Sequence, residues 1–130
     1  ENKLLSLEIM SDKKSLGPQG ENLAVEHLKG KGYSIRHRNW ISGKHEIDII
    51  AENRDFVVFV EVKTRSENPL VPPWESLSRT KLNSIIFCAE NYIRRYNINK
   101  QSRFDNIYII AEENGFRIEH VEDAYYPTLR

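Results

Sequence analysis

The chain has 130 residues, with 39% hydrophobic and 29% charged residues, which is typical of one globular domain with a substantial core. Its 19 basic and 19 acidic residues cancel, so net charge alone gives no reason to expect nucleic-acid binding. No segment has the apolar length of a transmembrane helix, and "ENKLLSLEIM" lacks the pattern of a signal peptide. With a single cysteine, Cys88, we expect a cytoplasmic protein without membrane contact.

We expect residues 1–14 to form an N-terminal extension without a catalytic role, and residues 15–130 to form a single domain. Gly17, Pro18 and Gly20 open a helical pattern that stops at Gly30 and Gly32. Three predicted strands follow, "YSIRHRN", "HEIDIIAE" and "FVVFVEVKTR".

A proline-rich loop, "SENPLVPPWE", leads to a long amphipathic helix predicted from Glu75 to about Tyr96. Two further strands, "RFDNIYIIAE" and "FRIEHVED", complete the order αβββαββ. This order predicts an α/β or α+β sandwich in which the strand at residues 56–65 is central.

The end of that strand is the first candidate for chemistry. Glu61 and Lys63 follow an apolar run, and the alternation of side chains puts them on one face with Val57 and Phe59. A strand that is apolar on both faces is usually buried on both. Charge is costly there unless it is paired or binds a metal.

Asp48 is expected to join this face across the hairpin. A turn centred on Asn53–Arg54 places Asp48 opposite Phe59, with about 5–8 Å between its β-carbon and that of Glu61. The same parity puts Glu46 on this face. Two such carboxylates repel unless a positive group lies between them, and Mg²⁺ or Mn²⁺ suits oxygen ligands. Lys63 could then orient or deprotonate a water; the alternative is a structural ion-pair cluster.

Two helix residues could add to the site. Glu21 falls on the apolar side of the first helix, in its predicted first turn, and could be a metal ligand or a helix-capping acid. Lys81 falls likewise in the first turn of the long helix, and could hold a phosphate or extend its stem over apolar surface. Between residues 63 and 103, eight basic residues against three acidic ones give a local charge of +5, which permits a binding face for an anion.

Seven segments together resemble the PD-(D/E)xK nuclease pattern and, more closely, the YraN-like family of uncharacterised bacterial proteins. They cover about residues 17–126 and read "GENLAVEHLKGKGY", "RNW", "HEIDII", "FVEVKTR", "KLNSIIFCAENYI", "RFD" and "IEHVEDAYY". The resemblance implies a restriction-endonuclease-like αβββαβ core with a mixed central sheet flanked by helices, and a likeness to Holliday junction resolvases.

Within this resemblance, Asp48 looks like the metal-binding aspartate, Glu61 and Lys63 like the Glu-x-Lys pair, and Glu21 like the helix-borne acid. Other characteristic positions, without a clear role, are matched by Arg65, Lys81, Arg103 and Asp105. The family usually has glycine where this chain has His45, which alternation points away from Asp48.

The resemblance therefore implies a metal-dependent endonuclease that hydrolyses phosphodiester bonds of DNA, including branched or damaged DNA. Its catalytic residues would be Asp48, Glu61, Lys63 and Glu21. Mg²⁺ or Mn²⁺ would be held by Asp48, Glu61 and Glu21, and backbone phosphates by Arg65, Arg79 and Lys81. Resolvase-type enzymes generally act as dimers, so a homodimer is compatible with this function. The alternative is a catalytically inactive nuclease-fold protein that binds nucleic acid or serves as a scaffold.

Overall fold

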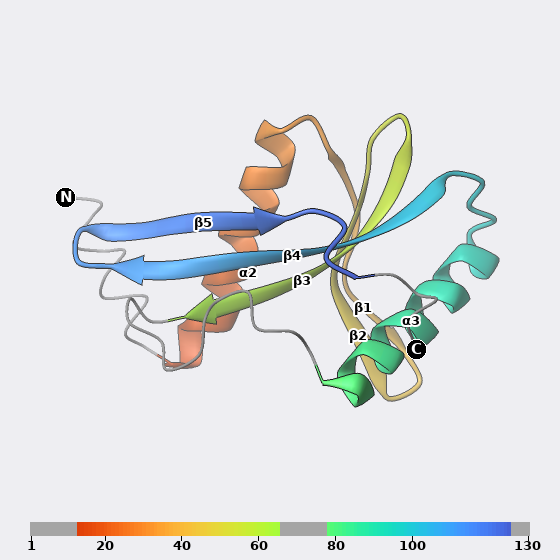
Figure 1. The fold of residues 1–130 in the computed structure, drawn as a ribbon, viewed down its shortest axis with the longest axis horizontal. Helices are drawn as coiled ribbons and strands as arrows, with labels where there is room; N and C mark the ends of the chain where they lie inside the picture. Colours follow the sequence, from red (N-terminus) through yellow and green to blue (C-terminus); the bar gives the residue numbers. More distant parts are fainter. Residues whose placement is uncertain (1–12, 66–77, 126–130) are drawn as a thin grey trace.

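The computed structural model describes residues 13–65 and 78–125, with side chains from residue 19 onward. Within these residues, two helices and five strands follow one another in the predicted order (Figure 1). They are α2 (Lys13–Gly30), β1 (Ser34–Ser42), β2 (His45–Glu52), β3 (Phe56–Arg65), α3 (Arg79–Arg95), β4 (Gln101–Glu112) and β5 (Gly115–Val121).

The five strands form one mixed sheet in the order β1-β2-β3-β4-β5, so β3 is central as predicted. β3 and β4 run parallel, whereas the other neighbouring pairs are antiparallel. Consecutive parallel strands need a crossover connection, and α3 lies within the connection from β3 to β4. The α/β fold with a mixed central sheet flanked by helices is therefore confirmed.

The alternating side chains of β3 separate two cores. Val58 and Val60 belong to the core that α2 covers, whereas Val57 and Phe59 belong to the core that α3 covers. The two helices therefore lie on opposite faces of the sheet. Glu61 continues the alternation of Val57 and Phe59 and so lies on the α3 face.

α2 begins earlier than predicted. Its backbone is helical from Lys13, so the expected start near Gly17–Gly20 is wrong. Gly20 is buried, and a β-carbon built there would lie 2.6 Å from Oγ1 of Thr64. The glycine that suggested a helix start instead permits the close approach of α2 to β3.

α3 begins later than predicted. Ser78 has an extended backbone, with φ −65° and ψ 157°, and its hydroxyl accepts a hydrogen bond from the backbone N of Lys81. This N-cap starts the helix at Arg79 rather than at Glu75. The cap places Lys81 in the first turn, as expected.

Other predicted boundaries shift by a few residues. β1 extends to Ser42, three residues beyond its predicted end, and β4 begins at Gln101. The predicted loop at residues 66–75 lies outside the described residues, as does the N-terminal extension up to residue 12. Cys88 is fully buried among apolar α3 residues, and neither described helix is long and apolar enough to cross a membrane.

Candidate active site

The turn between β2 and β3 is closed by an asparagine side chain. Oδ1 of Asn53 accepts hydrogen bonds from the backbone N of Asp55 at 3.0 Å and of Phe56 at 2.9 Å. The backbone N of Asn53 donates to the carbonyl of Phe56. The turn therefore centres on residues 54–55, and the expected centre at residues 53–54 is wrong, because the asparagine side chain organises the two residues that follow it.

This turn changes the register of the hairpin. Ile50 pairs with Phe59 and Ile49 with Val60, where the described ladder ends, so the predicted pairing of Asp48 with Phe59 is wrong by two residues. Ile47 packs in the core that α3 covers, whereas Ile49 packs in the core that α2 covers, so the alternation of side chains along β2 is interrupted at Asp48. The place of Asp48 relative to Glu61 therefore follows from the contacts of Asp48 itself rather than from parity.

The carboxylate of Asp48 reaches into the gap between the two strands. Its Oδ2 accepts a hydrogen bond from the backbone N of Val62 at 2.8 Å, just beyond the described ladder of β2 and β3. Burial, together with the charge of Glu61, raises the pKa of Asp48 to about 7, and the Val62 hydrogen bond opposes the rise. The charge of Glu61 therefore acts on the carboxylate of Asp48, so the two acids lie within electrostatic range of each other.

Glu61 is the buried acid of the pair, with 5% of the residue exposed. Its Oε2 lies 3.1 Å from Nζ of Lys81 and 3.9 Å from Nζ of Lys63. Its Oε1 is buried and has no hydrogen-bond partner within the described part of the chain. Among the described residues, only one of its two carboxylate oxygens thus has a partner.

Of the two lysines near Glu61, Lys81 has its ammonium closer to the carboxylate. Burial lowers the pKa of Lys81, but the charges of Glu61, Asp48 and Glu46 outweigh burial and raise it above the ordinary value of 10.5. Its side chain remains 42% exposed. The first turn of α3 therefore brings a positive charge to the predicted acidic face, while leaving it accessible to an anion in solvent.

Glu21 approaches the site from α2 but is engaged elsewhere. Its Oε1 accepts hydrogen bonds from Nδ2 of Asn39 at 3.0 Å and from Nη2 of Arg38 at 3.3 Å. Its charge contributes to the raised pKa of Asp48. Because α2 starts at Lys13, Glu21 lies well inside the helix rather than in the expected first turn. A helix-capping role is thereby excluded.

The described residues contain two neighbouring acids that could bind a metal, rather than three. Within residues 13–65 and 78–125, no three His, Cys, Asp or Glu side chains are grouped closely enough to hold a metal ion. The observation in favour of a cation is the chemistry of Asp48 and Glu61, two neighbouring carboxylates of which one has a buried oxygen without a partner. An oxygen-preferring divalent ion fits that pair, with water completing its coordination.

The predicted phosphate-binding arginines lie at two different places. Nη1 of Arg65 donates to the backbone carbonyl of Thr64 at the end of β3. Arg79 is exposed at the first position of α3. Arg103, which contributed to the predicted basic segment, is instead buried. It therefore adds nothing to a surface that could meet DNA.

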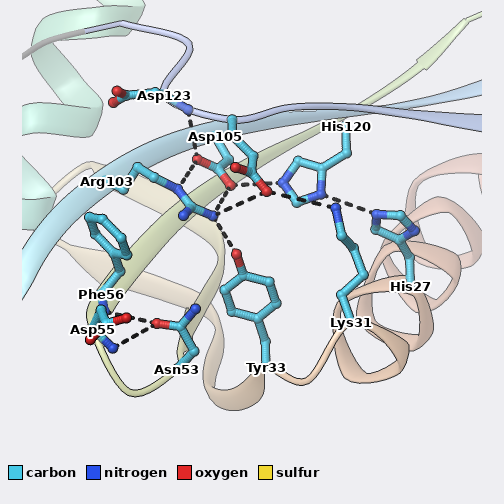
Figure 2. Close-up of polar contacts among 11 residues, drawn as sticks. His27, Lys31, Tyr33, Asn53, Asp55, Phe56, Arg103, Asp105, His120 and Asp123 are labelled. Carbon is cyan, nitrogen blue, oxygen red and sulfur yellow. Dashed lines mark hydrogen bonds and ion pairs between the residues drawn. The ribbon is translucent and has the colours of Figure 1, made fainter.

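A second polar cluster surrounds Asp105, which is fully buried (Figure 2). Nε and Nη2 of Arg103 each donate to its carboxylate at 2.9 Å, and Nε2 of His120 lies 2.7 Å from it. The backbone N of Asp123 donates at 3.0 Å to Oδ1 of Asp105, the oxygen that also accepts from Nε of Arg103. Burial raises the pKa of Asp105, but these hydrogen bonds outweigh burial and hold it below 3.8.

This Asp105 cluster joins α2, β4, β5 and the segment that follows β5. Nε2 of His27 on α2 lies 3.1 Å from Nδ1 of His120, as Figure 2 shows. After Asp123, the backbone N of Ala124 donates to the carbonyl of Phe104. The rings of Phe104 and Tyr125 are then 5.4 Å apart. The cluster therefore holds the segment that carries Tyr125 onto the α3 face.

The sequence did not indicate a role for Arg103 or Asp105, and His120 and Tyr125 were not among the predicted site residues. The spacing of Arg103 and Asp105, two residues apart on a strand, was an available signal because it predicts a common face. No local pattern indicates that His120 and Asp123 would meet Asp105. His45, in contrast, packs its ring against Phe87 of α3.

Fold and site together define an α/β protein whose central strand ends in an acid–lysine group. The model of the uncharacterised protein family UPF0102 matches residues 20–109, and the chain belongs to that family. A UPF0102 protein of Phocaeicola vulgatus is 40% identical over 120 residues, which are 92% of this chain and 99% of the relative. A UPF0102 protein of Bacteroides thetaiotaomicron is 42% identical with the same coverage. Another, from Parabacteroides distasonis, is 40% identical over 93% of this chain and its own full length.

Proposed function

We propose that the protein is a metal-dependent endodeoxyribonuclease that hydrolyses phosphodiester bonds. The observation that carries the proposal is the Asp48–Glu61 pair, in which burial and mutual repulsion raise the pKa of Asp48 to about 7. A strongly perturbed acid pair at the end of a central strand is costly to the fold, and such groups are concentrated at functional sites. The buried Oε1 of Glu61 without a partner adds a position for a cation or its water.

In this proposal Asp48 and Glu61 hold Mg²⁺ or Mn²⁺. When bound, the metal would stabilise negative charge on the phosphate and lower the pKa of a coordinated water. Lys63, with Nζ 3.9 Å from Glu61, would orient the attacking water and offset charge in the transition state. Glu21 is engaged with Arg38 and Asn39, so it would support the site through its charge.

The proposed substrate is DNA, including branched or damaged DNA. Arg65, Arg79 and Lys81 would contact backbone phosphates, which position a duplex without reading its sequence. The exposed ammonium of Lys81 would move between Glu61 and a phosphate oxygen. A homodimer is the assembly that fits paired cuts on a branched substrate, and sedimentation equilibrium would test it.

A second candidate is a protein that binds nucleic acid without cleaving it. The ion pair of Lys81 and Glu61 at 3.1 Å favours this candidate, because it neutralises the buried acid without a metal. Such a protein would retain DNA binding after Glu61→Gln. The proposed nuclease would retain binding as well, but would lose turnover.

The test is cleavage of labelled single-stranded, duplex, flap and four-way-junction DNA, each with Mg²⁺ or Mn²⁺. We expect Lys63→Ala to abolish cleavage and to keep metal binding, because its proposed partners are the water and the transition state. Asp48→Asn should lose both, because an amide cannot replace the charge of a ligating carboxylate. Lys29→Ala and Asp55→Asn change exposed residues of the same types and serve as matched controls.

Two results would count against the nuclease. Wild-type protein that cuts no substrate with either metal, while still binding DNA, would establish the second candidate. Cleavage that survives Asp48→Asn and Glu61→Gln at the wild-type rate would place the chemistry elsewhere or in a contaminant.

A further inference from the structure

Three buried side-chain atoms have no hydrogen-bond partner within the described part of the chain. They are Oε1 of Glu61, Oδ1 of Asn106 and Oη of Tyr125. Glu61 and Asn106 are each only 5% exposed. An unpaired buried polar atom destabilises the fold, and native proteins contain few such atoms. Their common neighbourhood therefore requires an explanation.

The three residues lie together on the α3 face of the sheet. Glu61 and Asn106 are paired in the parallel register of β3 and β4, so their side chains lie next to each other on the same face, across strands about 4.8 Å apart. The ring of Tyr125 packs 5.4 Å from that of Phe104, two residues before Asn106 on the same face. Burial raises the pKa of Tyr125, and the charge of Glu61 raises it further, so this hydroxyl also lies near the carboxylate.

The hydrogen-bonding capacity of the three atoms indicates which kind of group they could bind. Oε1 of Glu61 is an acceptor, and Asn106 presents its carbonyl oxygen because its Nδ2 donates to Oη of Tyr108 at 3.3 Å. Two neighbouring acceptors require a group with two donor hydrogens. Water supplies both, and its lone pairs remain available to a cation or to the hydroxyl of Tyr125.

We propose that Asn106 and Tyr125 bind a water of hydration of the divalent cation held by Asp48 and Glu61. This inference rests on the proposed metal site and assigns two positioning residues to it. Mg²⁺ keeps several of its waters when it binds a protein with few carboxylates. A site with two carboxylates and a place for water suits such an ion, and it explains why no third acid is grouped with the pair among the described residues.

The Asp105 cluster provides the framework for this arrangement. Asp105 anchors the backbone N of Asp123, and Phe104 anchors that of Ala124. Tyr125 follows directly, so its ring is positioned by the two backbone hydrogen bonds that Asp123 and Ala124 make to β4. The buried ion pair of Arg103 and Asp105 thereby acts on the metal site from the opposite face of the sheet.

The test is titration of the full chain with Mn²⁺, with free Mn²⁺ measured by electron paramagnetic resonance. We expect Tyr125→Phe and Asn106→Leu each to raise the Kd for Mn²⁺ by about tenfold, the size typical of residues that support a metal through its ligands. Asn106→Asp keeps an acceptor oxygen and should bind Mn²⁺ at least as tightly as wild type. Tyr96→Phe changes a partly buried tyrosine of the α3 core and should leave the Kd unchanged.

Thermal unfolding without metal separates this role from a structural one. Tyr125→Phe removes only an unpaired buried hydroxyl, so its melting temperature is expected to be unchanged or higher. Asn106→Leu also removes the hydrogen bond from Nδ2 to Tyr108, so its melting temperature is expected to fall slightly. If wild type binds Mn²⁺ and both Tyr125→Phe and Asn106→Leu bind it equally well, the inference is overturned and the proposed metal site stands. If wild type binds no Mn²⁺, the proposed metal site fails and the inference fails with it.

Discussion

Nζ of Lys81 lies 3.1 Å from Oε2 of Glu61 and joins the first turn of α3 to the end of β3. The same lysine feels the charges of Asp48 and Glu46. A helix lysine thus places a positive charge beside Glu61, as a bound cation would. Lysine and metal are expected to compete for one carboxylate oxygen.

Lys81→Met should therefore have opposite effects on stability and on metal binding. We expect the metal-free protein to lose about 1 kcal/mol at pH 8, a modest value because the lysine is partly exposed. The affinity for Mg²⁺ should rise, because the competing ammonium is gone. Urea unfolding and isothermal titration calorimetry measure the two effects. Lys44→Met, at an exposed residue of the β1–β2 turn, is the control, and unchanged Mg²⁺ affinity in Lys81→Met would contradict the competition.

Asp48→Asn should stabilise the metal-free protein at high pH. The pKa of Asp48 is about 7 in the folded protein, against an ordinary value of 3.8, so folding favours the protonated acid. Its stabilising contribution is complete below about pH 4 and is lost as pH rises through 7. The variant, which stays neutral, should be more stable than wild type by roughly 1–4 kcal/mol at pH 8 and similar to it at pH 4. The measurement is the unfolding free energy of both proteins across this pH range. If the two proteins showed the same dependence on pH, the link between folding and protonation of Asp48 would be refuted.

Asp105→Asn should show the opposite dependence on pH. The pKa of Asp105 lies below its ordinary value of 3.8, so its charged form stabilises the fold above about pH 4, and this contribution is lost as pH falls further. At pH 7 the substitution leaves the buried guanidinium of Arg103 without its carboxylate, at a cost of about 3–5 kcal/mol. Urea unfolding should show that the variant and the wild type differ less in unfolding free energy in acid than at pH 7. Asp55→Asn is the matched control at an exposed residue.

Binding of DNA should depend on salt through the proposed phosphate contacts. Arg79→Ala and Lys81→Ala should each lower the slope of log affinity against log salt by about 0.9 on duplex DNA, in equal measure for every sequence. Fluorescence anisotropy with two unrelated duplexes at several salt concentrations measures the slope. An unchanged slope for Lys81→Ala would mean that this lysine stays with Glu61 when DNA binds. Lys29→Ala, at an exposed residue of α2, is the control.

Much of the fold was predictable because its signals are local. The apolar runs of β2 and β3, the polar turn between them and the periodicity of α3 predicted the element order and the central strand. The alternation of side chains along β3 predicted that Glu61 and Lys63 share a face. The distance of 3.9 Å between Nζ of Lys63 and Oε2 of Glu61 agrees with this prediction. The register was less predictable, because it depended on which residue Asn53 would cap.

The sequence by itself determined which residues carry charge at the end of a buried strand, since alternation and burial are properties of neighbours along the chain. It did not determine that Glu21 would bond to Arg38 and Asn39, or that Tyr125 would approach Glu61. It also left open the meeting of His27, His120 and Asp105. These contacts join residues that are distant in sequence, and only the packing of α2, the sheet and the segment after β5 brings them within hydrogen-bonding or electrostatic range.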